Sequence, residues 1–462
     1  MDLSSRLCIN IPSIAADLEV LLDPDLCASL HNQIIEHACL VQPSLRRLVR
    51  RNVLTIPHSE IQDRNYEPSH AITESELPDI LGIALTDFLE KIDVFEFPEG
   101  DYHSHPMTPY SSPPILPNLW SFADHLLVKS GQDQSNLILL YSHAQSSTSG
   151  GLFLDTNEQV ANWLDLPGSF WPGNGIPLSE VLRRWLCMWE VGKFYLLGTG
   201  KFGVRSWIDK EVDQAVEAWE RLVVVIEARR TGFHRSGSGS DDDESRLMIE
   251  NGVLQRYQGD GFSRPFFAKA KNPPHGLKFV APGITTWDST SFQAVYSAAG
   301  DNRRRARQSH RLGRIIREEE NTPMIIFPAA NEIPAEVLER RAADVSGSQW
   351  MDDLIIVERK LGLYSTPGDG FGSTVTLIAD VDNRACFQRC DRCPWLPNGG
   401  RMTTLKEMLE IWTVLIEMNV WKVDGNGVVG GLEWFQRGTN KRQLEDGTEV
   451  DLNLIWGPEV EY

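Results

Sequence analysis

The apolar positions of this chain repeat one pattern twice. Residues 178–207 align without a gap on residues 405–434, and the offset between the two segments is 227 throughout. Each segment opens with apolar residues at helical spacing, such as Leu178, Val181 and Trp185, and then continues into a strand-like stretch and a glycine-rich turn. Nine aligned positions are identical, and the pattern predicts a helix followed by a β-hairpin in each segment.

The residue that ends each predicted helix supports the alignment on physical grounds. Gly192 stands where the first helix should stop, and Asn419 stands at the aligned position of the second. Glycine and asparagine are the residues that most readily adopt the left-handed backbone conformation found just after helices. Two different residues therefore meet one backbone requirement, and we expect the left-handed conformation at both.

Periodicity elsewhere predicts further elements. Residues 25–41, "DLCASLHNQIIEHACLV", have apolar positions at helical spacing. Residues 136–142 and 150–155 resemble a pair of strands, residues 265–270 ("PFFAKA") resemble a further strand, and residues 160–175 resemble a loop. The predicted fold class is α+β, with two related α+β units, each a helix followed by a β-hairpin, and a helical N-terminal region.

Shifts in composition suggest where the parts of the chain begin and end. Six prolines fall between residues 98 and 117, and the stretch from Gly237 to Arg246 is acidic and rich in glycine and serine. The predicted organisation is a helical N-terminal region at 1–97, a proline-rich linker at 98–118, repeat unit 1 at 119–235, a flexible acidic linker at 236–246, an intervening α/β segment with a basic run at 247–348, and repeat unit 2 at 349–462.

Length and charge narrow the classes of function. A chain of 462 residues is long enough for two or three domains. Its 64 acidic and 44 basic residues give a net charge of −20, which makes nucleic acid an unlikely general partner and argues against an anionic membrane surface. Seven cysteines without even spacing, and an N-terminus without a basic start and apolar core, indicate a reducing compartment, either cytoplasm or nucleus.

The glycine motif of the first segment looks at first like a phosphate-binding loop. Gly198, Gly200 and Gly203 have the GxGxxG spacing, in which backbone N–H groups can close on phosphate oxygens. The second segment keeps all three glycines but has Val428 in place of Lys201. A hairpin turn explains the glycines of both segments, so we interpret them as turn residues.

A cysteine cluster is the sharpest chemical signal. Cys386, Cys390 and Cys393 have the CxxxCxxC spacing that radical-SAM enzymes use to hold an iron–sulfur cluster. Only 69 residues follow Cys393, too few for the rest of such a barrel. A zinc site would need a fourth ligand, such as His310, Asp382 or Asp391. The three alternatives are plain thiols, a zinc site and an iron–sulfur cluster; no other cofactor is indicated.

Three further groups of residues carry weaker chemical signals. His103 and His105 form an HxH pair in the proline-rich loop, where polar loop residues are commoner than metal ligands. Asp380 and Asp382 stand at a strand end, where aspartates ordinarily form turns. A basic patch interrupts the acidic chain, and it could pair with the neighbouring Glu318–Glu320, act in nuclear import or contact phosphates. Its arginines are Arg303, Arg304, Arg305, Arg307, Arg311, Arg314 and Arg317.

No complete catalytic constellation accompanies these features, so the catalytic residues are unknown and enzymatic activity stays an open question. The sequence favours a soluble intracellular, non-catalytic interaction or regulatory protein built on a duplicated α+β unit, with another protein as its partner. The alternative is a metal-dependent enzyme that uses Cys386, Cys390 and Cys393.

Overall fold

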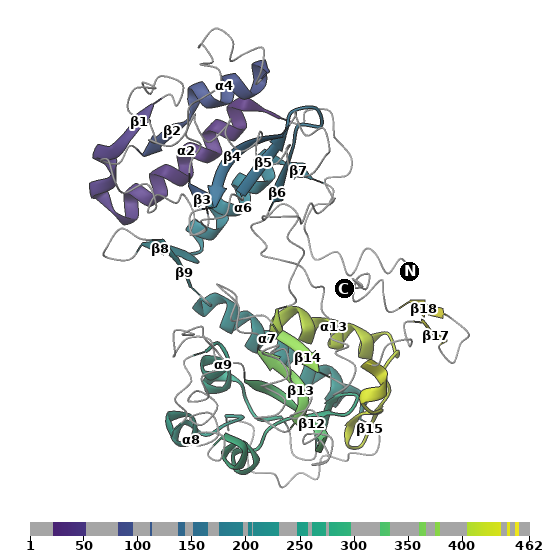
Figure 1. The fold of residues 1–462 in the computed structure, drawn as a ribbon. Helices are drawn as coiled ribbons and strands as arrows, with labels where there is room; N and C mark the ends of the chain where they lie inside the picture. Colours follow the sequence, from purple (N-terminus) through teal and green to yellow (C-terminus); the bar gives the residue numbers. More distant parts are fainter. Residues whose placement is uncertain are drawn as a thin grey trace, which may run out of the picture. The chain divides into compact units, whose positions relative to one another are not determined.

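Helices and mostly antiparallel sheets make up this protein, which confirms the mixed α+β class (Figure 1). The computed structural model describes residues 22–51, 82–95, 111–112, 137–143, 151–164, 175–196, 202–205, 207–230, 247–256, 261–273, 277–296, 324–332, 360–365, 375–378, 404–435, 441–443 and 449–451. The chain divides at Arg205 and Ser206 into an N-terminal unit and a C-terminal unit. Helix α7 (Asp209–Arg229) belongs to the C-terminal unit, whereas the sequence pattern places it in repeat unit 1.

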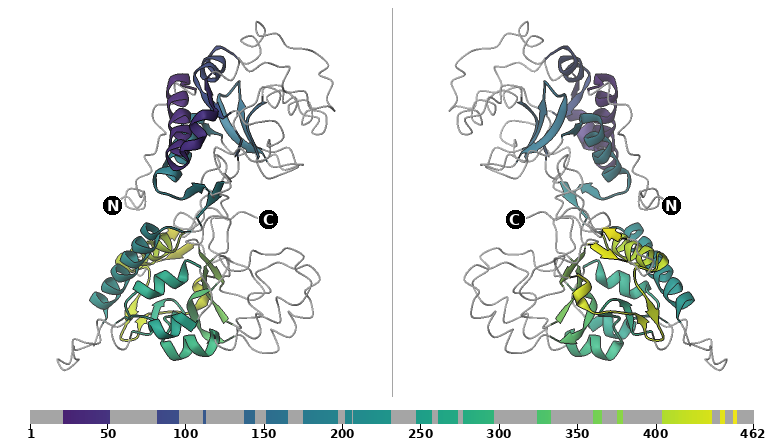
Figure 2. Two further views of the ribbon diagram at one scale, coloured as in Figure 1. Left: turned by 90° about the vertical axis from the view of Figure 1, so that its left-hand side faces the viewer. Right: turned by 90° about the vertical axis from the view of Figure 1, so that its right-hand side faces the viewer.

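The N-terminal unit is an antiparallel sheet covered on one face by helices (Figure 2). The sheet runs in the order β3 (Ser111–Ser112), β4 (Leu137–His143), β5 (Gly151–Asp155), β6 (Val160–Leu164) and β7 (Ile176–Pro177). The helices are α2 (Pro24–Val41), α4 (Ile83–Lys91) and α6 (Leu178–Glu190). A short helix, η1 (Pro43–Leu48), and the strand pair β1 (Val49–Arg51) and β2 (Asp93–Phe95) complete the helical side.

Two local differences from the sequence patterns occur in these units. The residues expected to be a loop at 160–175 include strand β6, because Asp155 accepts hydrogen bonds from the backbone of Asn157 and Glu158 and so turns the chain tightly back along β5. In the segment expected to be a strand at 265–270, residues 265–269 belong to helix α9 (Ser263–Lys269) and Ala270 is its C-cap. The short apolar run of this segment is compatible with a strand or a helix. The helix buries Phe266 and Phe267 in the core, and this packing favours it.

A buried histidine ties the core of the N-terminal unit together. The side chain of His31, on α2, is fully buried. Its Nε2 donates a hydrogen bond to the carbonyl oxygen of Asp93 at 2.7 Å, so its Nδ1 is unprotonated and accepts from the Tyr141 hydroxyl at 2.8 Å. Burial lowers the pKa of His31 to about 4, although the bond to Asp93 opposes this shift. The ring therefore links α2, β2 and β4 in its neutral form.

The C-terminal unit is built on a seven-stranded sheet. Its order is β14 (Val375–Ile378), β13 (Lys360–Ser365), β12 (Ile325–Glu332), β11 (Ile284–Thr285), β10 (Phe279–Ala281), β16 (Gly427–Val428) and β15 (Val423–Asp424). The β10–β16 pairing is parallel and the other pairings are antiparallel. The remaining elements are α8 (Asn251–Arg256), α9, α13 (Leu405–Glu417), η4 (Leu432–Phe435) and the separate hairpin of β17 (Lys441–Gln443) and β18 (Glu449–Asp451).

Helices α7 and α13 pack beside each other against this sheet, as the views of Figures 1 and 2 agree. Phe327, on β12, stacks on Trp219 of α7 at 5.2 Å between ring centroids and lies 6.2 Å from Trp412 of α13. At their C-terminal ends the helices are joined by Arg229, which donates a hydrogen bond to the carbonyl oxygen of Glu417 at 2.8 Å. Aromatic packing and this polar contact fix α13 over the sheet.

The two helix-and-hairpin segments that align in sequence have similar local geometry. Helices α6 and α13 have the same length, and the residues that follow them, Gly192 and Asn419, have φ values of 74° and 58°. The predicted left-handed conformation is confirmed at both positions. Each helix is followed by an antiparallel hairpin, which is β8 (Phe194–Leu196) with β9 (Phe202–Val204) in the first segment and β15 with β16 in the second.

The segments also differ. Thr404 and Glu407 form a reciprocal capping box at the start of α13, with Glu407 bonded to the Thr404 backbone at 3.0 Å. The aligned helix α6 starts at Pro177, which has no capping side chain, and Glu180 there pairs with Arg183 and Arg184 instead. The aligned residues Glu180 and Glu407 therefore make different contacts: Glu407 caps its helix, whereas Glu180 forms ion pairs.

Candidate functional site

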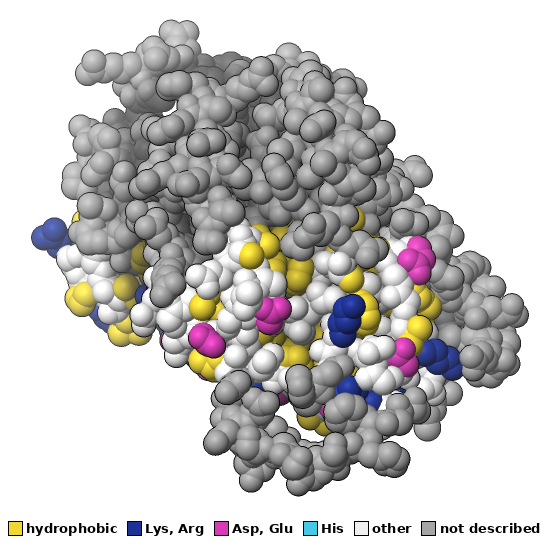
Figure 3. Space-filling model, turned by 90° about the horizontal axis from the view of Figure 1, so that it is seen from below, with side chains coloured by type: hydrophobic (Ala, Val, Ile, Leu, Met, Phe, Trp, Pro, Cys, Tyr) yellow, Lys and Arg dark blue, Asp and Glu magenta, His cyan; other side chains and the backbone are white. Residues whose placement is uncertain are grey.

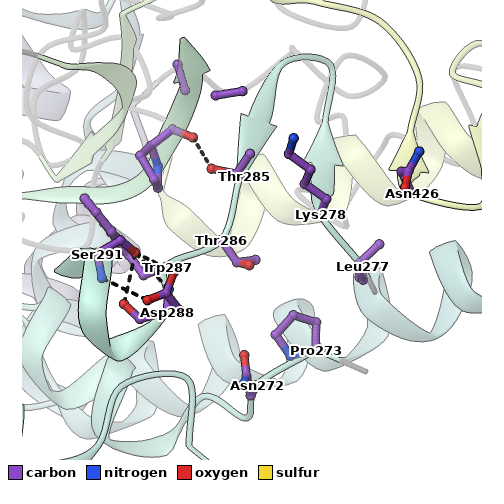
Figure 4. A pocket seen from close by; sticks show the side chains of 13 residues that line it. Asn272, Pro273, Leu277, Lys278, Thr285, Thr286, Trp287, Asp288, Ser291 and Asn426 are labelled. Atoms are coloured by element: carbon purple, nitrogen blue, oxygen red, sulfur yellow. Dashed lines mark hydrogen bonds between the residues drawn. The ribbon is translucent and has the colours of Figure 1, made fainter. Parts of the chain in front are cut away.

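The C-terminal unit contains an open cleft of about 630 Å³ beside the β10–β11 hairpin. Four other segments line it: the loop after α9, residues 286–291 after β11, the middle of β12, and the turn between β15 and β16. Figure 4 shows Lys278 and Thr285 on the hairpin, Asn426 facing them from the β15–β16 turn, and Asn272 on the loop. The polar residues of the lining are Asn272, Lys278, Thr285, Thr286, Asp288, Ser291 and Asn426.

The floor of the cleft is held rigidly. Trp287 is buried and donates a hydrogen bond through its indole nitrogen to the carbonyl oxygen of Ile325, on β12, at 3.0 Å. Its ring packs against Phe292 and Tyr296 with centroids 5.7 and 5.9 Å away. The Thr285 hydroxyl donates to the carbonyl oxygen of Pro328 at 3.1 Å. These contacts fasten the hairpin to β12, so the floor is formed before any ligand arrives.

One wall of the cleft is the two-residue turn of Gly425 and Asn426. The backbone carbonyl oxygen of Asn426 accepts from the backbone nitrogens of Lys278 and Phe279 at 2.8 and 3.1 Å. The turn is held from the other side by Arg230, whose guanidinium is buried and donates to the Gly425 carbonyl oxygen at 2.7 and 3.1 Å. Asn426 is thus fixed by its backbone while its side chain remains at the cleft.

The wall depends on Gly427, because this residue has no side chain where β16 meets β10. Its φ is +119°, and a Cβ atom at this position would lie 2.2 Å from the carbonyl oxygen of Phe279. Only glycine lets β16 approach β10 this closely with this backbone conformation. The glycines of the second segment are therefore hairpin and close-approach residues, in agreement with the sequence interpretation. Gly430 has a similar constraint, because a Cβ atom there would meet the indole ring of Trp434 at 2.8 Å.

The carboxylate of Asp288, which lines the cleft, is already hydrogen-bonded within the protein. It accepts hydrogen bonds from the backbone nitrogens of Thr290 and Ser291 and from the Ser291 hydroxyl, at 2.8 to 2.9 Å. These bonds place it at the start of the helical residues 289–296. Partial burial would raise the pKa of Asp288, but the hydrogen bonds from Ser291 and Thr290 outweigh it and lower the pKa. Asp288 thus acts as a helix cap.

Four other polar side chains of the cleft are uncommitted. Within the described part of the chain, the side chains of Asn272, Lys278, Thr286 and Asn426 make no hydrogen bond or ion pair. Lys278 contacts only an aromatic ring, with its ammonium nitrogen 5.0 Å from the centroid of Phe279. Two amides, a hydroxyl and an ammonium offer both donors and acceptors to a ligand. This arrangement suits binding.

One face of the described residues has a surface of mixed character. On the face of the molecule seen in Figure 3, hydrophobic side chains of the described residues are exposed in several patches, and acidic and basic side chains are scattered singly between them. In that view neither sign of charge dominates the described surface. An interface on such a surface would combine apolar contact with individual polar contacts.

The sequence-predicted site residues lie outside the described residues. This applies to Cys386, Cys390 and Cys393, to the histidines His103, His105 and His310, and to the aspartates Asp380, Asp382 and Asp391. It also applies to the basic patch of Arg303, Arg304, Arg305, Arg307, Arg311, Arg314 and Arg317. The proposals based on these residues therefore stay predictions.

The sequence did not reveal the cleft. Its uncommitted residues come from segments that are far apart in the chain, between Asn272 and Asn426, and none belongs to a recognisable motif. The sequence signal nearest to the cleft was the turn Asp424-Gly-Asn-Gly427, which correctly predicted a hairpin but not what its Asn426 would face.

Across the described ranges, no three or more His, Cys, Asp or Glu side chains are grouped so that they could hold a metal ion. Among the described helices, none is both long and apolar enough to cross a membrane.

Comparison with known proteins adds no relative to this picture. The chain matches no family model, no curated protein and no solved structure.

Proposed function

We propose that this protein is an intracellular, non-catalytic interaction or regulatory protein built on a duplicated α+β unit, and that the cleft of its C-terminal unit binds a segment of a partner protein. The observation that carries the proposal is the set of four uncommitted side chains, Asn272, Lys278, Thr286 and Asn426, around a rigid floor. Polar side chains without internal partners can bond to a ligand without first breaking a hydrogen bond inside the protein.

The openness of the cleft favours a chain segment over a small molecule. Asn272, Lys278, Asp288 and Asn426 are all exposed, whereas sites for small ligands usually enclose about 70–90% of the ligand surface. An extended segment needs less enclosure, because it continues beyond the cleft and makes contacts along its length. Leu277, Trp287 and Pro328 are among the apolar residues of the lining.

Peptide display on the immobilised full-length protein tests the proposal. We expect a library of random short peptides to yield sequences that bind the wild type and that bind the Asn272→Ala/Asn426→Ala double variant about tenfold more weakly, since each lost hydrogen bond costs roughly 0.5–1.5 kcal/mol. Alanine fits the backbone at Asn426, which is not among the residues with positive φ.

Asn157→Ala is the matched control, because Asn157 is an exposed asparagine in a turn of the N-terminal unit. It should leave binding unchanged. Equal binding by the wild type and the double variant would contradict the proposal.

The metal-dependent alternative rests on the spacing of Cys386, Cys390 and Cys393. It predicts that protein purified without oxygen carries a stoichiometric amount of zinc or iron, which Cys390→Ser loses. Cys187→Ser is the control, because Cys187 is an exposed free cysteine on α6, away from the cluster in sequence, and it should keep the metal. Metal analysis and a visible spectrum separate zinc from an iron–sulfur cluster. Wild-type protein without metal would contradict this alternative.

A further inference from the structure

The uncommitted groups of the cleft indicate the kind of segment that it takes. We propose that the cleft recognises an acidic segment of a partner protein, with one carboxylate of the segment against the Lys278 ammonium and its backbone amides against Asn272, Thr286 and Asn426. This inference rests on the proposed binding role of the cleft and adds the chemistry of the partner.

Lys278 is the group that selects for negative charge. Its backbone nitrogen is bonded to the Asn426 carbonyl oxygen, so the root of the side chain is fixed. The ammonium is exposed, and within the described residues it has no carboxylate partner, although the chain has 64 acidic and only 44 basic residues. Contact with the Phe279 ring, at 5.0 Å from its centroid, limits where the ammonium lies. A positioned, unpaired cation is complementary to a carboxylate.

Asp288 does not cancel this selectivity. Its carboxylate is turned toward the N–H groups of Thr290 and Ser291, at the start of helical residues 289–296. The positive end of a helix dipole and these donors offset part of the carboxylate charge at that end of the cleft. The overall charge of −20 opposes a single carboxylate less than it opposes a polyanion such as nucleic acid, and at physiological salt exposed charges are screened beyond about 8 Å.

The amide and hydroxyl groups complement the backbone of such a segment. An extended chain presents N–H and C=O groups in alternation, and an asparagine side chain can donate to one and accept from the other. Asn272 and Asn426 approach the cleft from separate elements, as Figure 4 shows, with Thr286 between the loop and the hairpin. A phosphorylated segment fits less well, because phosphate recognition typically uses arginine clusters and the lining has one lysine and no arginine.

Charge-swap selection tests the inference. Random short peptides are selected in parallel on full-length wild type and on Lys278→Glu, and selected peptides are then synthesised with a fluorescent label for titration. We expect an acidic residue at one position of the wild-type peptides and a basic residue at that position on Lys278→Glu. For one wild-type peptide, Lys278→Met should weaken binding about two- to fivefold, the range for an exposed ion pair. Raising the salt concentration should weaken wild-type binding by a similar factor.

Lys210→Glu is the matched control, since Lys210 is an exposed lysine on α7 outside the lining of the cleft. It changes the net charge equally and should keep the acidic preference. Peptides that depend on Asn272 and Asn426 but show no charge preference would overturn this inference and leave the proposed function standing. If no selected peptide depends on any of these residues, both are overturned. Acidic enrichment that persists on Lys278→Glu overturns the inference alone.

Discussion

Acidification from pH 7 to pH 4 is expected to remove about 3 kcal/mol from the free energy of opening of the core of the N-terminal unit, because opening lets His31 bind a proton that burial disfavours in the folded unit. The pKa of His31 is about 4 in the folded protein, whereas an unperturbed histidine, as in the unfolded chain, has a pKa of 6.5. Between these values the unfolded state binds a proton that the folded state does not. The stabilising contribution is therefore complete above pH 6.5 and is lost as the pH falls toward 4.

The structural reason is that protonation of His31 places a charge in the core and requires the Tyr141 hydroxyl to turn from donor to acceptor. Its Nδ1 accepts from the Tyr141 hydroxyl, and the ring lies among buried groups that include Phe88. Tyr141 cannot compensate by ionising, since burial raises its pKa well above the usual value. Protonation therefore reverses the hydrogen bond between α2 and β4 and leaves an uncompensated charge in the core.

Hydrogen exchange of α2 and β4 peptides, corrected for intrinsic exchange rates at each pH, measures this free energy in the full-length protein. His31→Gln keeps a donor and an acceptor but does not titrate, so it should lack the acid-dependent loss. His37→Gln makes the same change six residues further along α2 and serves as the control. This variant should still show the acid-dependent loss in the free energy of opening. An equal acid-dependent loss in wild type and His31→Gln would show that other groups cause it.

Gly427→Ala is expected to destabilise the C-terminal unit by about 2–6 kcal/mol, the combined range for backbone strain and overpacking. Alanine strongly disfavours a φ of +119°, and its Cβ atom would overlap the Phe279 carbonyl oxygen. Relief requires β16 to move away from β10, which also displaces Asn426 from the cleft. Peptide binding should therefore weaken along with stability.

Urea unfolding, together with hydrogen exchange of peptides from β10 and β16, measures the effect. Gly252→Ala is the matched control, because Gly252 lies in helix α8 with no atom within 4 Å of an added Cβ. That change should be neutral or stabilise the protein by up to about 1 kcal/mol. Similar stabilities for the two variants would mean that Gly427 is not required for the approach of the two strands.

The sequence correctly predicted features that depend on the local backbone, namely helix positions, helix ends and a hairpin turn. The apolar spacing of Leu178, Val181 and Trp185 predicted α6, and Gly192 and Asn419 predicted where α6 and α13 end. The turn glycines predicted the β15–β16 hairpin. These features depend on residues within one or two turns of each other, so a linear pattern contains them.

Ambiguous segments and the cleft depended on tertiary contacts. The residues 265–270 became helix through packing of Phe266 and Phe267 against the core, which no local period specified. The role of His31 likewise came from Asp93 and Tyr141, which meet it only in the folded unit.

The sequence by itself determined the α+β class, the helix-and-hairpin segments and the conformations of their ends, because each follows from steric preferences of nearby residues. Only the tertiary structure decided that Asn272, Lys278 and Asn426 face one cleft, and that the Asp288 carboxylate is engaged as a helix cap. The physical reason is that side chains far apart in the chain are brought together by sheet pairings such as β10 with β16, and these pairings depend on the whole core.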